Sequence, residues 1–249
     1  MELGFGAAGA ALTVGALASR KLPLSPGIKK SAGIVLGLGA AGCLAWTGWC
    51  YAARKAFSYD GERKLSKQIV EGTAEYVTLP EGGVGLDVGC GSGALTITCA
   101  KRNPQARMVG VDRWGPEYAS YNKALCEQNA AAENVTNVRF QKGDACKLEF
   151  ADECFDAVTS NYVYHNITGV DKQKLLRETL RVLKKGGTFA IHDLMEKSRY
   201  GDMEKFAAEL RAEGFEEVRL IPTANGKFMS KREGICYFLA GSTLLVGKK

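Results

Sequence analysis

A cluster of glycines just after an acidic residue is the feature of the sequence best suited to do chemistry. Residues 86–93 read Leu-Asp-Val-Gly-Cys-Gly-Ser-Gly. Glycine lets the backbone turn tightly and brings its N–H groups close to a ligand. Apolar residues precede the run and a helical pattern follows it, so we expect a strand, this turn and then a helix. A junction of this kind is typical of sites for nucleotide-like ligands.

Two classes of ligand fit the turn. Gly89, Gly91 and Ala94 match the dinucleotide pattern G-x-G-x-x-G/A, and Asp112 lies 21 residues after Gly91, where a ribose-binding acid would sit. The pattern alone is weak, because a glycine-rich turn can also be merely a turn. On these residues alone, a nicotinamide-dependent oxidoreductase stays open.

Further acidic and glycine signals follow, each at the end of its own expected strand. They are Asp112 after Val-Gly-Val, the triplet Gly143-Asp144-Ala145, and the motifs at 155–161 and 183–188, the last expected as a turn before a strand. With this set the sequence resembles the class I S-adenosylmethionine-dependent methyltransferases of the small-molecule type, over about residues 83–249. A dehydrogenase has no need of these signals in this order, so the resemblance favours a methyltransferase with S-adenosyl-L-methionine as its cofactor.

The resemblance implies which residues bind that cofactor. It places Asp87 near the ammonium end of the ligand and Asp112 on the two ribose hydroxyls. Asp144 would hold the adenine amino group, with the backbone N–H of Ala145 beside it. The full expected set is Asp87, Gly89, Cys90, Gly91, Gly93, Asp112, Arg113, Asp144, Ala145 and Asn161. No metal site is expected, because the two histidines and eight cysteines form no ligand pattern.

Methyl transfer from a sulfonium is a direct displacement, so the enzyme mainly aligns the acceptor with the methyl group and excludes water. A general base is needed only when the acceptor must lose a proton. His165 follows an expected strand and is the first candidate for a base or acceptor contact, with Tyr162 and Tyr164 as further catalytic candidates. His192 and Asp193 are a weaker alternative. A packing role for either histidine stays open.

The acceptor is narrowed by what the sequence lacks. Residues 160–164 read Ser-Asn-Tyr-Val-Tyr, not the Asn-Pro-Pro-Tyr of family members that methylate amino nitrogens of nucleobases and glutamine. From Ser58 onward 27 basic residues face 26 acidic ones, because six of the 33 basic and one of the 27 acidic residues precede it. A nucleic-acid partner is therefore not expected.

Strands alternate with helices along residues 58–249, which we expect to form the methyltransferase domain. This order predicts an α/β, Rossmann-like, doubly wound and mostly parallel seven-stranded sheet with an antiparallel last strand. The first expected strand ends at Asp87. The other six cover residues 108–112, 138–141, 155–160, 188–192, 217–221 and 242–246. The first expected helix of the sheet domain begins at Gly93. The others cover residues 117–133, 172–183 and 203–213.

Residues 1–57 are expected to form apolar helices, a hairpin associated with a membrane. Residues 31–53 are 23 consecutive residues without a charge, enough to cross a bilayer, whereas the 17 residues at 3–19 are at the lower limit. Gly33 and Gly37 have the G-x-x-x-G spacing that lets two helices approach closely. Whether one or both segments span stays open, as do a signal peptide and buried core helices.

These features together predict a membrane-associated methyltransferase whose domain faces the cytoplasm and whose acceptor is small and hydrophobic or lipid-soluble. The apolar stretch at 225–239 is expected as a loop, either a lid over the acceptor or an ordinary connection. Its candidate lining residues are Phe228, Met229, Tyr237 and Phe238. A non-catalytic membrane adaptor that keeps the fold is the main alternative, and the oligomeric state is not indicated.

Overall fold

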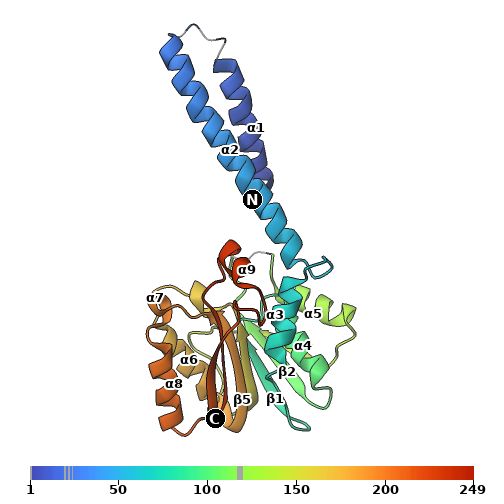
Figure 1. Cartoon of the computed structure of the whole chain (residues 1–249). Coiled ribbons are helices and arrows are strands. Elements are labelled where there is room, and N and C mark those ends of the chain that lie inside the picture. Colours follow the sequence, from blue (N-terminus) through green and yellow to red (C-terminus); the bar gives the residue numbers. More distant parts are fainter. Residues whose placement is uncertain (1, 20, 22, 24, 117–119) are drawn as a thin grey trace. The chain divides into compact units, whose positions relative to one another are not determined.

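The computed structural model of the chain describes residues 2–19, 21, 23, 25–116 and 120–249. The chain divides into two compact units, Met1–Ser66 and Lys67–Lys249, which are described separately (Figure 1). This division falls a few residues after the predicted domain boundary at residue 57.

The first unit consists mainly of two helices, α1 (Glu2–Ser19) and α2 (Pro26–Phe57), as the apolar segments predicted. Of the described helices, α2 is long and apolar enough to cross a membrane, and α1 contributes a shorter apolar stretch, Ala7–Ser19. Length and composition alone support a membrane span here, so they leave the topology open.

Close packing between α1 and α2 depends on other glycines than the sequence predicted. A Cβ atom added to Gly9 would lie 3.2 Å from Cys43 Cβ, and one added to Gly39 would lie 3.3 Å from Leu12 Cδ1. A Cβ added to Gly33 or Gly37 meets nothing within 4 Å in the described part of the chain. The prediction that the G-x-x-x-G pair mediates the approach of these helices is therefore wrong.

The second unit is built on a seven-stranded sheet in the order β3-β2-β1-β4-β5-β7-β6. The strands are β1 (Val84–Val88), β2 (Arg107–Asp112), β3 (Val138–Lys142), β4 (Phe155–Asn161), β5 (Leu183–Leu194), β6 (Glu216–Pro222) and β7 (Ser242–Lys248). The pairs among β1 to β5 are parallel, and β7 lies antiparallel between β5 and β6. The predicted fold, with its antiparallel last strand, is confirmed.

Helices cover both faces of this sheet, which explains why its central strands β1 and β4 are almost entirely buried. Figure 1 shows α3 and α4 on one face and α6 and α8 on the other. The helices are α3 (Leu65–Ala74), α4 (Ala94–Arg102), α5 (Lys123–Ala132), α6 (Lys172–Arg181), α7 (Lys197–Tyr200), α8 (Met203–Ala212) and α9 (Lys231–Cys236). Leu86, Val158 and Phe189 are fully buried in the core between these layers.

Three predicted elements differ from the structure. Helix α5 begins only at Lys123, where the side chain of Asn122 caps it, and residues 117–119 of the predicted helix lie outside the described part of the chain. Strand β5 already begins at Leu183, so the predicted turn at 183–188 is an irregular start of the strand, with Gly186 at φ +79° and a register shift against β4. The predicted loop at 225–239 contains α9.

Candidate functional site

The candidate site lies at the carboxyl ends of β1, β2 and β4. From β1 the chain proceeds to β2 and β3 on one side, and then returns to β4 and β5 on the other. Open α/β sheets bind ligands at this switch of direction, beyond the carboxyl ends of the strands. The glycine run, Asp112 and the segment after β4 all meet there, as the sequence predicted.

The glycine run forms a tight loop that is fixed to the neighbouring strand. Gly89, Gly91 and Gly93 have φ values of +73°, +55° and +85°, which glycine adopts far more easily than other residues. The N–H groups of Gly89 and Cys90 both donate to the carbonyl oxygen of Val111, at 2.8 and 3.0 Å. Among the described residues, a Cβ on Gly91 would meet only Tyr121, at 3.8 Å, so they leave this side of the loop open to a ligand.

Asp112, at the end of β2, holds the loop through its carboxylate. Its Oδ2 accepts from Gly91 N–H at 2.9 Å, and its Oδ1 accepts from Trp114 N–H at 2.8 Å. The indole N–H of Trp114 in turn donates to the carbonyl oxygen of Gly91 at 3.0 Å. A carboxylate has about four lone-pair positions, so both oxygens keep acceptor capacity for a ligand. Trp114, whose φ is +44°, was not predicted from the sequence.

The acidic loop after β3 lies next to Asp112. Strands β2 and β3 pair in register up to Asp112 and Lys142, and Gly143 N–H donates to the carbonyl oxygen of Asp112 at 3.0 Å. Asp144 is exposed, and its Oδ1 accepts from Cys146 N–H at 2.8 Å. Arg113 is also exposed and Ala145 is half-buried. The loop therefore presents an exposed carboxylate at the same edge of the sheet.

Asp87 lies fully buried beneath the glycine loop. Its oxygens accept from the hydroxyls of Thr96, at 2.6 Å, and Thr159, at 3.0 Å. Burial disfavours the charged carboxylate and raises the pKa of Asp87 to about 6, although both hydroxyls act in the opposite direction. A buried acid with only neutral donors around it would be stabilised by a cation above it.

The segment after β4 packs directly on the glycine loop. A Cβ on Gly89 would lie 2.5 Å from Val163 Cγ1, so only glycine fits against this valine. The short 3₁₀ helix η2 (Tyr164–Asn166) follows. Its first side chain, Tyr164, is fully buried, with its hydroxyl 2.5 Å from Thr179 Oγ1. Tyr164 is therefore part of the core, and the predicted catalytic role for it finds no support in this geometry.

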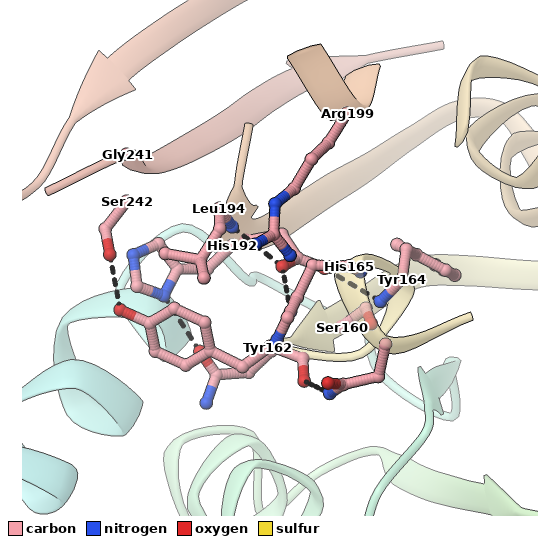
Figure 2. Close-up of polar contacts among 12 residues, drawn as sticks. Ser160, Tyr162, Tyr164, His165, His192, Leu194, Arg199, Gly241 and Ser242 are labelled. Atoms are coloured by element: carbon pink, nitrogen blue, oxygen red, sulfur yellow. Dashed lines mark hydrogen bonds and ion pairs between the residues drawn. The ribbon is translucent and has the colours of Figure 1, made fainter. Parts of the chain in front are cut away.

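His165 differs from its neighbour Tyr164 because its side chain reaches the edge of the site. The ring Nδ1 of His165 lies 2.5 Å from Asp193 Oδ1, and the backbone N–H of His165 donates to Asp193 Oδ2 at 3.2 Å (Figure 2). The side chain of His165 is 16% exposed, whereas that of Asp193 is completely buried. The two predicted candidates thus form one histidine–carboxylate pair.

His192 forms the second histidine site and cannot act as a base. Its Nδ1 lies 2.8 Å from Asn161 Oδ1 and its Nε2 lies 2.8 Å from Thr223 Oγ1. Burial lowers the pKa of His192 to about 3, so the ring is neutral at physiological pH. The weaker prediction of His192 as a base is wrong for this reason. Asn161, predicted to contact the cofactor, uses its side-chain oxygen to position His192.

Four rings line this edge of the sheet, and we call them the aromatic row: His165, Tyr162, His192 and Phe228. The ring centroid of Tyr162 lies 6.1 Å from that of His165 and 4.7 Å from that of His192. The centroids of Phe228 and His192 are 5.4 Å apart. The hydroxyl of Tyr162 bonds to Ser242 Oγ at 2.7 Å, as Figure 2 shows. Burial raises the pKa of Tyr162, so its hydroxyl stays protonated.

The connection between β6 and β7 carries the last ring and meets α3. A Cβ on Gly72 of α3 would lie 2.9 Å from Phe228 Cδ1, and the Lys227 ammonium lies 5.5 Å from the ring centre of Tyr76. Phe228 and Met229 are buried and Phe238 is 68% exposed. Their role as lining residues of a lid stays a prediction. The segment contains helix α9, whose start is held by a capping box between Ser230 and Glu233.

The arrangement matches a known domain. A family model described as a methyltransferase domain matches residues 80–231, which is more than half of the chain. The chain belongs to the class I S-adenosylmethionine-dependent methyltransferases.

Curated relatives of this methyltransferase act on different acceptors, according to their names. The 2-phytyl-1,4-naphtoquinone methyltransferase of Thermosynechococcus vestitus is 34% identical over 120 residues, which are 48% of this chain and 49% of the relative. The arsenite methyltransferase of Halobacterium salinarum is 28% identical over 166 residues, 59% of this chain and 41% of the relative. The chain thus spans about half of these relatives' length or less.

A solved structure supports the fold of the methyltransferase. The geranyl diphosphate C-methyltransferase of Streptomyces coelicolor A3(2), crystallised with Mg²⁺, geranyl diphosphate and S-adenosyl-L-homocysteine, superposes with a TM-score of 0.56. The superposition covers 74% of this chain and 79% of the other, at 14% identity. Within the described residues we find no group of three or more histidine, cysteine, aspartate or glutamate side chains placed to hold a metal ion.

Asp87 gives a first testable prediction. Its folded-state pKa of about 6 lies above the ordinary value of 3.8, so the folded protein binds this proton more tightly than the unfolded chain does. The contribution of Asp87 to stability therefore falls as pH rises from about 4 to about 6. Asparagine does not titrate, so Asp87→Asn should be more stable than wild type above pH 6, by about 2–3 kcal/mol. Below pH 4 this gain should disappear.

The measurement is the difference in the free energy of unfolding between the two proteins from pH 3.5 to 8. Taking the difference removes the other acids, such as Asp156 and Asp193, whose pKa values are lowered. A constant difference over this range would show that Asp87 does not carry the raised pKa.

Proposed function

We propose that this methyltransferase moves the methyl group of S-adenosyl-L-methionine to a small, hydrophobic acceptor while it is attached to a membrane. The observation that carries the proposal is the place of the aromatic row. It begins at His165, two residues from the valine that packs on Gly89, and so adjoins the loop expected to hold the cofactor. Tyr162 and His165 are partly exposed at this edge, and the buried rings of His192 and Phe228 continue the row. Sites for small hydrophobic ligands are typically lined by such rings with few polar groups.

The residues around the glycine loop fit S-adenosyl-L-methionine. Gly91 is open toward a ligand, and Asp112 can accept the two ribose hydroxyls while it holds the loop. The exposed carboxylate of Asp144 suits the adenine amino group. The positive methionine end of the cofactor would offset the buried charge of Asp87. Cys90, Gly93, Arg113, Ala145 and Asn161 are proposed as further contacts to the cofactor.

The proposed acceptor class is supported by the aromatic row and by one relative. The name of the Thermosynechococcus protein specifies a naphthoquinone with a phytyl chain, which is a lipid-soluble acceptor. His165 and Tyr162 are the proposed contacts to the acceptor, and Phe228 and Met229 would close the apolar side. A non-catalytic membrane adaptor would not need these contacts to an acceptor.

Binding and turnover of the full chain in detergent test the proposal. Calorimetric titration should show S-adenosyl-L-methionine binding, with no comparable binding of NAD. Methyl transfer should then be found among hydrophobic phenols, quinols, thiols and lipids, with trivalent arsenic included because of the second relative. Binding without transfer to any of these would favour the adaptor, and absence of binding would refute the assignment.

Membrane attachment through residues 1–57, with the methyltransferase domain facing the cytoplasm, is the second part of the proposal. It is supported by the 32-residue helix α2 and by Arg54 and Lys55 in its last turn, where cations flank spans on the cytoplasmic side. We expect the full chain to sediment with membranes after cell lysis and to resist extraction by 0.1 M carbonate at high pH. Recovery in the high-speed supernatant would contradict it, and a chain beginning at Ser58 is the control expected there.

A further inference from the structure

We propose that His165 is a general base positioned by Asp193, and that the acceptor is therefore an aromatic hydroxyl group, which loses its proton as it is methylated. This inference rests on the proposed methyltransferase function and narrows its acceptor. Thiols that ionise readily and trivalent arsenic present a lone pair without such help, so they would not need a general base.

The buried carboxylate is held in one orientation. Asp193 Oδ2 accepts from the N–H groups of Tyr164, at 2.8 Å, and His165, at 3.2 Å. Its Oδ1 accepts from Leu194 N–H at 2.7 Å and lies 2.5 Å from His165 Nδ1. Burial by itself would raise the pKa of Asp193, but the hydrogen bonds from His165 and from Leu194 N–H lower it below its ordinary range. The carboxylate is thus ionised and cannot rotate away.

This arrangement fixes the proton on one nitrogen of His165. Because an ionised carboxylate only accepts hydrogen bonds, Nδ1 must carry a proton, and the neutral ring then presents an unprotonated Nε2. Among the described residues Nε2 has no hydrogen-bond partner. A carboxylate that orients a histidine and stabilises its protonated form is a common basis of proton abstraction.

Among the described residues of the aromatic row and η2, the other side chains that could take this proton are already bonded. His192 is neutral with both nitrogens bonded, the Tyr162 hydroxyl is bonded to Ser242, and the Tyr164 hydroxyl is bonded to Thr179. On α7, Arg199 pairs with Glu196 at 3.2 Å. His165 is therefore the one partly exposed base along the described aromatic row.

The proposed step balances with one acceptor and one methyl donor. The O–H bond of the acceptor breaks and its proton passes to Nε2 of His165, which becomes an imidazolium paired with Asp193. The electron pair left on the oxygen forms the new O–CH₃ bond. The bond between that carbon and the donor's sulfonium sulfur breaks at the same time, and its electron pair returns to sulfur as a neutral thioether. The imidazolium then releases its proton to water.

The aromatic row favours an aromatic hydroxyl over an aliphatic one. A flat ring can pack against Tyr162 by offset or edge-to-face contact, which stabilises aromatic pairs beyond their buried area. Phenols also have pKa values near 10, so a general base can remove their proton during the reaction and thereby accelerate it.

The test varies the acidity of the acceptor in a series of para-substituted phenols from 4-methoxyphenol to 4-nitrophenol, using the full chain in detergent. Asp193→Asn should lower kcat for 4-methoxyphenol by about 100-fold or more. For 4-nitrophenol, which is already ionised at pH 8, the same variant should lose less than about 5-fold. A merely structural defect would lower all ratios of variant to wild type equally, and that result would overturn the proposal.

Two further variants keep the test decisive. His165→Gln changes a partly exposed side chain and should show the same dependence on acidity even if Asp193→Asn folds poorly. Asp156→Asn is the matched control, since Asp156 lies at the opposite end of β4 and pairs with Lys184 at 2.8 Å. It should retain wild-type ratios for every phenol, and an acidity-dependent loss in this control would overturn the proposal.

The NMR resonance of the proton between His165 and Asp193 provides a measurement that does not depend on activity. In wild type its NMR resonance should lie far downfield, as expected for a short charge-assisted hydrogen bond, and it should be lost in Asp193→Asn. Absence of that resonance in wild type would count against the pair. If the donor binds and thiols are methylated but no phenol is, this inference fails while the proposed function stands. If the donor does not bind, the proposed function itself fails.

Discussion

Valine in place of Gly89 should abolish binding of S-adenosyl-L-methionine. Gly89 has a φ of +73°, a conformation that costs a β-branched residue about 1–2 kcal/mol. A Cβ would also lie 2.5 Å from Val163 Cγ1, and extra volume in a packed site costs about 1–3 kcal/mol more. The loop must therefore move, and a shift near 1 Å is enough to lower affinity or activity by about 100-fold. Calorimetric titration and thermal unfolding measure the two effects.

Gly82→Val is the matched control for this experiment. Gly82 has nearly the same φ, +69°, but a Cβ there meets nothing within 4 Å among the described residues. Gly82→Val should lose only the stability that backbone strain costs, and it should still bind S-adenosyl-L-methionine. If Gly89→Val binds the cofactor as tightly as Gly82→Val does, the contact between the glycine loop and Val163 does not control the site.

The contact between Gly89 and Val163 also shows what sequence patterns can and cannot reveal. The glycine run was readable because a residue type and a spacing specify a backbone conformation, and the loop took the predicted place after β1. The identity of the residue above it was not readable, since Val163 is 74 residues away in the chain and reaches the loop only through the pairing of β1 with β4. Local pattern determines the loop, and sheet pairing determines what packs on it.

Tyr164 and His165, after β4, show the same limit of sequence patterns for single side chains. Tyr164 and His165 are neighbours in the 3₁₀ helix η2, yet one enters the core and the other reaches the site edge. A single turn has no repeating pattern from which the buried side could be predicted. The partner of His165 comes from β5, 28 residues later. Helix α9 is too short for a periodic signal, although Ser230 and Glu233 did carry its capping box.

In the N-terminal helices the difficulty is of another kind. Glycines occur on several sides of α1 and α2, so spacing alone does not identify the packed side. The structure uses Gly9 and Gly39, not the G-x-x-x-G pair. A motif whose residues are common in apolar helices therefore predicts that two helices can approach, and the long-range packing decides where they do.

Asp112→Asn should weaken binding of S-adenosyl-L-homocysteine by about 10- to 100-fold. In wild type each oxygen of Asp112 accepts one backbone N–H, from Gly91 and Trp114, and the proposal adds the ribose hydroxyls. The amide of asparagine has one oxygen and one NH₂ group, so it must place a donor against a donor at one of these positions. Hydrogen bonds to a charged group contribute about 1.5–3 kcal/mol each, which corresponds to this loss. Calorimetric titration measures it.

The decisive comparison uses the 2′-deoxy analogue of S-adenosyl-L-homocysteine, because it separates a direct contact with the sugar from support of the loop. If the Asp112 carboxylate accepts from the ribose hydroxyl, wild type should prefer the hydroxylated ligand about tenfold or more, and Asp112→Asn should lose most of that preference. If the variant weakens both ligands by the same factor, Asp112 acts only through Gly91 and Trp114. The carboxylate would then shape the loop without touching the sugar, and the binding mode proposed for this end of the cofactor would be wrong.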